Sequence, residues 1–99
     1  MDGRLALVVA TPPARGDFER AERLAHAARG RGLDVDIFLM AGAAVWAADP
    51  RAAALVEEGC EVVVCGTNFG AEAVPGVLVG SQDDHARMVS RADRVVALT

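Results

Sequence analysis

The sequence predicts an α/β protein in which a five-stranded parallel sheet carries helices on both of its faces. Three observations lead to this prediction. Short apolar segments alternate along the chain with segments whose apolar residues recur at helical spacing. The first apolar segment, Leu5–Ala10, contains no polar residue, as is typical of a strand buried on both faces. Residues 1–99 contain no linker or repeat, so we expect a single domain.

The first strand is followed by a loop, a helix and a second strand. The loop Thr11–Gly16 contains two prolines, and Asp17 suits the cap of the helix that comes next. Arginines and glycines at 29–32 end this helix. Leu33–Met40 is rich in branched and aromatic residues and predicts the second strand. Gly42–Ala48 is alanine-rich and ambiguous, with room for one helical turn.

The next helix and the third strand have clearer boundaries. Asp49 suits the cap of the helix, Pro50 suits its first position, and Gly59 ends it. Glu61–Val64 then predicts a strand, with Cys65 at its carboxyl end.

The last third of the chain predicts two more strands. Gly66–Gly70 is a glycine-rich turn that leads into a short helical stretch, which Val74–Gly76 ends. Val77–Val79 predicts a short fourth strand. Ser81–Asp84 is a variant capping box that opens a helix, and Arg94–Leu98 predicts the last strand. The order of the strands in the sheet cannot be derived from the sequence.

Composition narrows the classes of partner. The net charge is −4, and the ten basic residues form no stripe or tail, which argues against a nucleic-acid partner. No apolar stretch approaches the roughly 18 residues of a membrane span, and residues 1–10 lack the features of a signal peptide. Two cysteines cannot form a disulfide scaffold, so we expect reduced thiols and a cytoplasmic location.

Cys65 is the obvious nucleophile at the edge of the predicted sheet where ligands gather, beyond the carboxyl ends of the strands. If Thr67 or Asn68 caps a helix, the positive end of that helix favours the thiolate over the thiol. The alternative is that Cys65 is a small buried hydrophobe, and position alone does not separate the two.

The other candidate residues, Cys60, His26 and His85, are weaker candidates for a reactive group. Cys60 lies about 16 Å from Cys65 along an extended strand, so the two cannot form a disulfide within one chain, and we expect Cys60 to pack. His26 and His85 fall on predicted helices and are read as helix residues, although His85 is nearer the carboxyl edge. Two histidines and two scattered cysteines have no zinc-site spacing, so no metal is expected.

The loop after the first strand lacks the glycine patterns that bind dinucleotides or nucleoside triphosphates, so no cofactor is expected. Arg15 and the backbone amides of this loop could still bind an anion. This signal is weak, because any loop between a strand and a helix offers as much.

Three segments carry a resemblance to a known family: Val63–Thr67 (Val-Val-Cys-Gly-Thr), Gly76–Ser81, and the run from Met88 to Val96. In these segments the chain resembles the DsrE/DsrF-like family of sulfur-relay proteins. That family has a strand ending in Cys-Gly-Thr or a similar triplet and a short strand leading to a glycine. A helix with an inward Met follows, and Ala-Asp-Arg-Val or Ala-Asp-Lys-Val begins the last strand. The resemblance covers nearly the whole chain.

The resemblance implies a three-layer α/β/α domain with a five-stranded parallel sheet, as in the DsrEFH-like proteins, that forms homotrimers or homohexamers. It also implies a small cytoplasmic persulfide carrier or sulfurtransferase in which Cys65 is the catalytic residue. The amides of Gly66 and Thr67 would stabilise the sulfur anion. Sulfur donor and acceptor proteins would be its partners.

Two other functions stay open. One is a non-catalytic oligomeric binding or scaffold protein of the same fold, in which Cys65 only packs. The other is a small-anion or nucleotide binder that uses the loops after the first and third strands. Val45 and Trp46 have no obvious place in so small a sheet, so we expect their segment to pack against another subunit.

Overall fold

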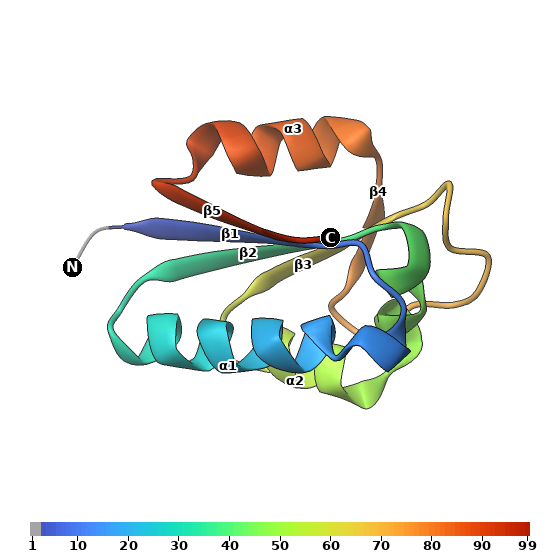
Figure 1. The fold of residues 1–99 in the computed structure, drawn as a ribbon, viewed down its shortest axis with the longest axis horizontal. Coiled ribbons are helices and arrows are strands. Elements are labelled where there is room, and N and C mark those ends of the chain that lie inside the picture. The colour runs from blue at the N-terminus through green and yellow to red at the C-terminus, as the bar shows by residue number, and fades with distance from the viewer. Residues whose placement is uncertain (1–2) are drawn as a thin grey trace.

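The computed structural model describes residues 3–99, and these form a five-stranded parallel sheet between helices (Figure 1). Met1 and Asp2 of the predicted domain lie outside the described residues. The strand order is β4-β3-β2-β1-β5, and all neighbouring strands are parallel. The strands are β1 (Arg4–Val9), β2 (Asp34–Leu39), β3 (Glu61–Cys65), β4 (Leu78–Gly80) and β5 (Arg94–Leu98). The α/β class and the parallel sheet predicted from the sequence are confirmed.

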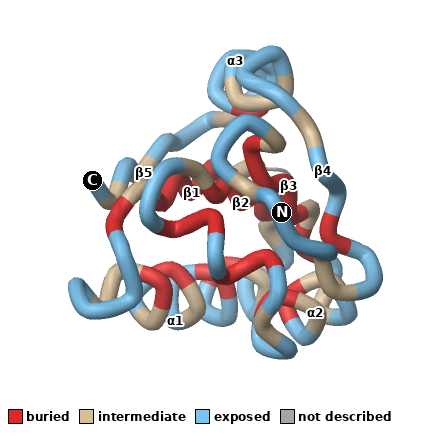
Figure 2. Tube along the Cα trace, turned by 90° about the vertical axis from the view of Figure 1, so that its right-hand side faces the viewer, coloured by how far each residue is buried: buried red, intermediate tan, exposed pale blue. Residues whose placement is uncertain are grey.

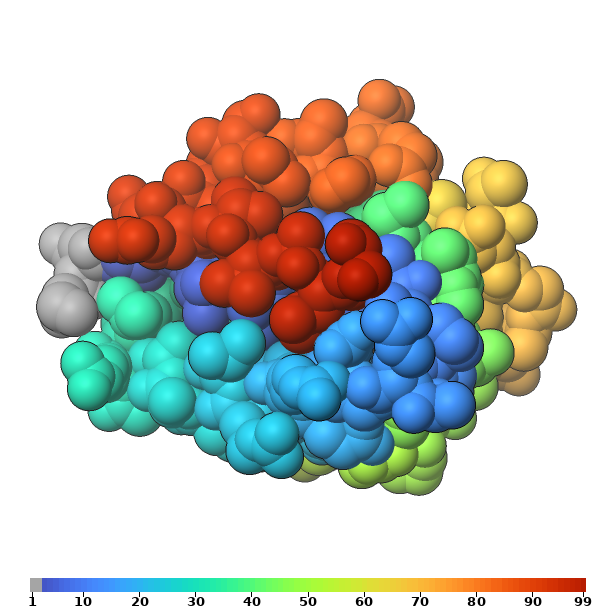
Figure 3. Space-filling view, viewed as in Figure 1, coloured from blue at the N-terminus to red at the C-terminus, as the bar shows by residue number. Residues whose placement is uncertain are grey.

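The helices lie on both faces of the sheet. In Figure 1, α1 and α2 lie below the strands and α3 lies above them. The bounds of the helices are α1 (Asp17–Gly30), α2 (Pro50–Glu57) and α3 (Gln82–Arg91), and the short helices of 3-10 geometry are η1 (Pro13–Arg15) and η2 (Ala41–Ala48). Figure 3 shows β5, in red, at the surface between α3 and α1.

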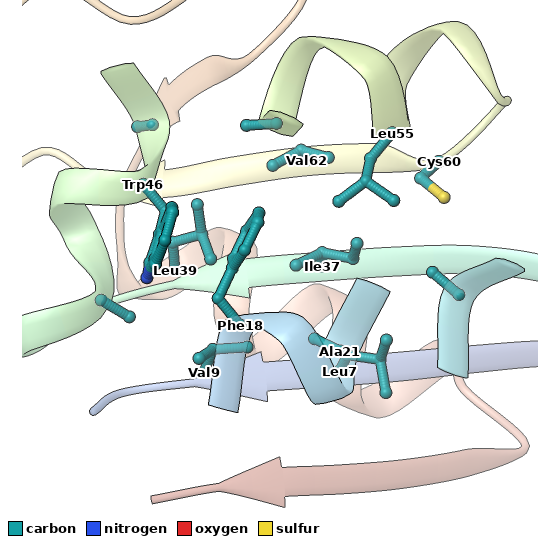
Figure 4. Packing of buried hydrophobic residues seen from close by; sticks show 14 of the residues in the cluster. Leu7, Val9, Phe18, Ala21, Ile37, Leu39, Trp46, Leu55, Cys60 and Val62 are labelled. Carbon is teal, nitrogen blue, oxygen red and sulfur yellow. The ribbon is translucent and has the colours of Figure 1, made fainter. Parts of the chain in front are cut away.

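The main core fills the space between the sheet and the helices α1, α2 and η2 (Figure 4). Small side chains make most of it, and they let the helices approach the sheet closely. Its largest group is an aromatic pair in which Phe18 stacks on Trp46 with ring centroids 4.3 Å apart. The Arg51 guanidinium lies 4.4 Å from the Trp46 ring centroid and so covers the pair.

A smaller core lies between the sheet and α3. It consists of four buried residues, Phe38, Val63, Cys65 and Met88. Figure 2 shows that most of α3 is exposed, in contrast to the buried strands beneath it.

A buried charge holds the far end of α3 on the sheet. Asp36 on β2 is fully buried and accepts hydrogen bonds from Arg4 at 2.8 Å and from the Arg91 guanidinium at 2.9 and 2.8 Å. Without Arg91 the buried Asp36 carboxylate would keep only Arg4 as a charged partner, so the contacts of Arg91 stabilise α3 in its position on the sheet.

Three predictions of local structure are wrong. The stretch after Gly70 is not helical, because the chain forms a turn at 66–68 and an irregular loop up to β4. Asp17 is the first residue of α1 and not its cap, which is Gly16, and the Asp17 carboxylate accepts a hydrogen bond from the Thr11 hydroxyl at 2.6 Å. Trp46 has a place inside the chain, and of its segment Val45 is the large side chain that stays exposed.

Within residues 3–99, no helix is both long enough and apolar enough to cross a membrane.

Candidate functional site

Cys65 is the last residue of β3, at the carboxyl edge of the sheet. Its strand is buried because Val62, Val63 and Val64 have packed neighbours on both faces. The Cys65 side chain lies on the α3 side, in the same cluster as Phe38 and Met88, and only 2% of the residue is exposed. The chain then turns at once, since the Asn68 amide donates to the Cys65 carbonyl oxygen at 3.1 Å.

The surroundings of the sulfur act on its pKa in two directions. Burial raises the pKa of the Cys65 thiol. Hydrogen bonding from the Thr67 amide, the Gln82 side chain, the Thr67 hydroxyl and the Asn68 amide lowers the pKa by more, so the pKa of Cys65 lies below its ordinary value. Donors that face a sulfur atom favour the thiolate, which is the nucleophilic form.

Gln82 is the part of the site that the sequence did not reveal. Its Nε2 donates to the Cys65 Sγ at 3.6 Å, and its Oε1 lies 2.9 Å from His85 Nδ1. Gln82 is the first residue of α3 and follows the Ser81 cap. A capping box identifies this helix start in the sequence, but only the pairing of β4 with β3 shows that the start lies beside Cys65.

A helix start therefore does lie beside the sulfur, but it belongs to α3 and not to a helix that begins at Thr67 or Asn68. The Asn68 side chain does not cap a helix. Its Oδ1 accepts a hydrogen bond from the Ala41 amide at 3.0 Å. This bond ties the loop after β3 to the start of η2.

Of the two amides expected at the sulfur anion, the Thr67 amide contributes to lowering the pKa of Cys65. The Gly66 amide donates to the Gly80 carbonyl oxygen at 2.9 Å, so the expectation for Gly66 is wrong. The reason is that Gly66 continues the ladder between β3 and β4 by one bond beyond the strand.

Arg15 is not part of the site around Cys65. It lies in η1, after β1, and β2 separates β1 from β3 in the sheet. Two strand spacings amount to about 10 Å. Arg15 is exposed, and its carbonyl oxygen accepts a hydrogen bond from Arg20 at 2.9 Å.

Cys60 differs from Cys65 in its place on the strand and in its pKa. It lies just before β3, at the opposite end of that strand, and packs near Leu55 in the main core (Figure 4). Burial and the nearby Glu58 carboxylate raise the pKa of the Cys60 thiol to about 11. Both cysteines are free, and Cys60 is a packing residue.

Gly80 permits the close packing of this edge. A Cβ atom at this position would lie 2.8 Å from Val63 Cγ1 and would collide with the Asp84 carboxylate. Within residues 3–99, no group of three or more His, Cys, Asp or Glu side chains is arranged to hold a metal ion.

The sheet and its helices have the DsrE-like α/β fold, and this chain carries a cysteine at the carboxyl end of its third strand. One solved structure with this fold is the crystal structure of the YchN protein from E. coli. The two structures agree with a TM-score of 0.82 over 99% of this chain and 100% of that chain, at 20% sequence identity. This likeness shows a shared fold. No family model matches the chain, and no curated protein matches its sequence.

Proposed function

We propose that this protein carries sulfane sulfur as a persulfide on Cys65 and passes it from a donor protein to an acceptor protein in the cytoplasm. The observation that carries the proposal is the set of donors around the Cys65 sulfur, which lower the pKa of a thiol at the carboxyl edge of the sheet. The shared fold with YchN and the sequence resemblance to the sulfur-relay family support it.

Two displacements at sulfur make up the transfer. The Cys65 thiolate attacks the outer sulfur of a donor persulfide, a new S–S bond forms, the donor's S–S bond breaks, and the donor leaves as a thiolate. An acceptor thiolate then attacks the outer sulfur held on Cys65. The acceptor becomes the persulfide, and Cys65 leaves as a thiolate. The cycle needs no further oxidant or reductant.

The test is sulfur loading measured by intact-protein mass spectrometry. After incubation with a small persulfide donor, the protein should gain the mass of one sulfur atom, and cyanide should remove it. Cys65→Ser should abolish this gain. Cys60→Ser, the matched control, should load as the unchanged protein does. Loading that persists in Cys65→Ser would show that the proposal is wrong.

The burial of Cys65 favours a second function, that of a non-catalytic binding or scaffold protein. A residue that is 2% exposed and packed on Phe38 and Met88 also suits a purely structural thiol. In that case Cys65 resists iodoacetamide in the folded protein, and Cys65→Ala leaves the assembly intact.

We also propose that the functional form is a homo-oligomer, a trimer or a hexamer. Val45, Leu78 and Val79 support this proposal, since each is more than half exposed, at 57%, 54% and 58%. Large apolar side chains exposed on the surface of a small protein favour contact with another subunit.

A further inference from the structure

The Gln82 side chain lies between two groups and contacts both. One end of its amide donates from Nε2 to the Cys65 Sγ at 3.6 Å, and the other end, Oε1, lies 2.9 Å from His85 Nδ1. Gln82 and His85 are three residues apart on α3, a spacing that places two side chains on one face of a helix.

The oxygen end of the Gln82 amide faces His85, and the nitrogen end faces the sulfur. A carbonyl oxygen only accepts, so His85 Nδ1 carries the proton and donates it to Gln82 Oε1. The NH₂ group of Gln82 is then the end that meets the sulfur. In the reversed arrangement the oxygen would face the sulfur, and it would repel a thiolate.

The His85 ring is itself held in place. It stacks on Phe38 with ring centroids 5.0 Å apart and planes inclined by 13°. Phe38 is fully buried and belongs to the same cluster as Cys65. The donor at Nδ1 is therefore anchored to the core under α3, and the amide is held from both sides.

The apolar surroundings make the Gln82 donor important. Phe38, Val63, Met88 and Met40 pack in the cluster around Cys65 and are uncharged. The Asp84 carboxylate, in the first turn of α3, accepts hydrogen bonds from the Ser81 amide and from Arg87. A hydrogen bond to an anion is stronger in such a site than in water.

The structure assigns to Gln82 the role of a catalytic hydrogen-bond donor to the Cys65 sulfur, and to His85 the role of the positioning residue that holds the Gln82 amide in the donating orientation. This assignment rests on the proposed sulfur transfer for its chemistry. The Cys65 sulfur is negative before it attacks the donor persulfide and again when it leaves the acceptor. The Gln82 N–H faces it at both moments.

The first test removes the donor. Gln82→Leu should shift the pH profile of Cys65 alkylation to higher pH and lower the rate at pH 7 by roughly tenfold, because a hydrogen bond to an anion is lost. Peptide mass spectrometry reads Cys65 separately from Cys60. The matched control is Ser90→Leu, which places the same side chain at another exposed position of α3 and should leave the profile unchanged. An unchanged profile in Gln82→Leu would overturn the assignment.

The second test distinguishes the hydrogen bond from His85 Nδ1 from the stacking of the His85 ring. His85→Phe keeps the stacking on Phe38 but lacks Nδ1, and it should shift the alkylation profile in the same direction as Gln82→Leu, by roughly threefold in rate. His85→Asn lacks the ring, yet its amide nitrogen takes the place of Nδ1 and should restore most of the rate. The positioning role is wrong if His85→Phe behaves as the unchanged protein or if His85→Asn is as slow as His85→Phe.

The outcomes distinguish the two proposals. Sulfur loading on Cys65 together with an unchanged alkylation profile in Gln82→Leu would leave the proposed function standing and overturn the assignment. A shifted profile in a protein that never accepts sulfur would support the assignment of Gln82 as a donor and overturn the proposed function.

Discussion

The two cysteines show how much a few neighbours change one kind of side chain. Burial and Glu58 raise the pKa of Cys60 to about 11, whereas Cys65 is also buried but has donors aimed at its sulfur, which lower its pKa. Cys60 lies just before the strand that Cys65 ends, so the contrast arises over the length of one strand.

This contrast predicts selective alkylation. Only thiolates are alkylated, so the Cys65 rate should reach half of its plateau at a lower pH than the rate of an ordinary thiol does. Cys60 should stay unmodified near neutral pH. Peptide mass spectrometry after iodoacetamide treatment from about pH 5 to about pH 10 measures both rates. Equal labelling of the two cysteines at pH 7 would contradict the prediction.

At the same scale, the sequence predicts the position of Cys65 but not all of its surroundings. An apolar strand that ends in Cys65, Gly66 and Thr67 is visible in the sequence, because burial follows from the valines before it. The sequence does not identify Gln82 as a site residue, because Gln82 is 17 residues away from Cys65 and their contact depends on two features of the fold. These are the pairing of β4 with β3 and the capping of α3 at Ser81.

Among the elements, the junction of β4 and α3 depends on a glycine. Gly80→Ala would place a Cβ atom 2.8 Å from Val63 Cγ1 and against the Asp84 carboxylate, so the start of α3 must move. We expect it to lower the free energy of unfolding by about 1–3 kcal/mol, as overpacking does. Chemical denaturation measures this change.

Gly70→Ala is the matched control for this substitution. A Cβ atom at Gly70 meets nothing within 4 Å, so the free energy of unfolding should stay within about 0.5 kcal/mol of the original. Equal stabilities of the two variants would contradict the close packing described at Gly80.

The cap of α3 predicts a dependence on pH. The Ser81 amide donates to the Asp84 carboxylate and, with Arg87, holds the pKa of that carboxyl below its ordinary value. A group with a lowered pKa in the folded state stabilises the fold above its unfolded pKa, here about 3.9, and this stabilisation is lost as the pH falls through the lower, folded value.

Asp84→Asn should therefore flatten the fall of the thermal midpoint below about pH 4. Asp83→Asn changes an exposed carboxylate of the same helical turn and is the control. Its curve should run parallel to that of the unchanged protein. Curves for Asp84→Asn and Asp83→Asn that coincide would show that the cap does not contribute to acid stability.

The elements that sequence patterns predicted well have local causes. Asp49 caps α2 by accepting from the Arg51 amide at 2.9 Å, and Pro50 begins that helix, as expected. The loop at 66–77 was predicted partly as helix and is irregular, because its backbone bonds to other elements. The Val74 amide donates to the Ala47 carbonyl oxygen at 2.8 Å, and the Gly66 amide donates to Gly80. Such distant contacts override local propensity.

For the molecule as a whole, the two faces of the sheet are unequally covered. Five strands about 4.8 Å apart span roughly 19 Å, whereas a helix is about 10 Å across. In the part of the chain that the structure describes, α3 is the one helix on its face (Figure 2). Leu78 on β4 and Val95 on β5 flank it there, 54% and 43% exposed.

This imbalance supports the proposed homo-oligomer and makes it testable. Light scattering at micromolar concentration should give the mass of a trimer or a hexamer, because burying the exposed apolar side chains on both sides of α3, Leu78 and Val95, stabilises the association. Leu78→Glu should shift the mass toward that of one chain. A single-chain mass for the unchanged protein would show that the proposal is wrong.

The strand order is a property of the whole molecule that could not be predicted from the sequence. The segment pattern predicts that strands and helices alternate, and right-handed crossovers leave few arrangements. In the structure β5 lies next to β1 and β4 forms the opposite edge of the sheet. This arrangement depends on long-range packing, which local sequence patterns do not predict.

The burial of Cys65 has a consequence for when its sulfur can react with a partner protein. In the closed arrangement the sulfur is 2% exposed, too little for a protein-sized partner to touch. Two residues that interact with the sulfur, Thr67 and Gln82, are exposed, and Thr67 belongs to a stretch without helix or strand. Such stretches open at a smaller free-energy cost than a packed strand. In the proposed sulfur transfer, delivery would therefore wait for a brief opening of this stretch, and a persulfide on Cys65 would be shielded from stray reductants between openings.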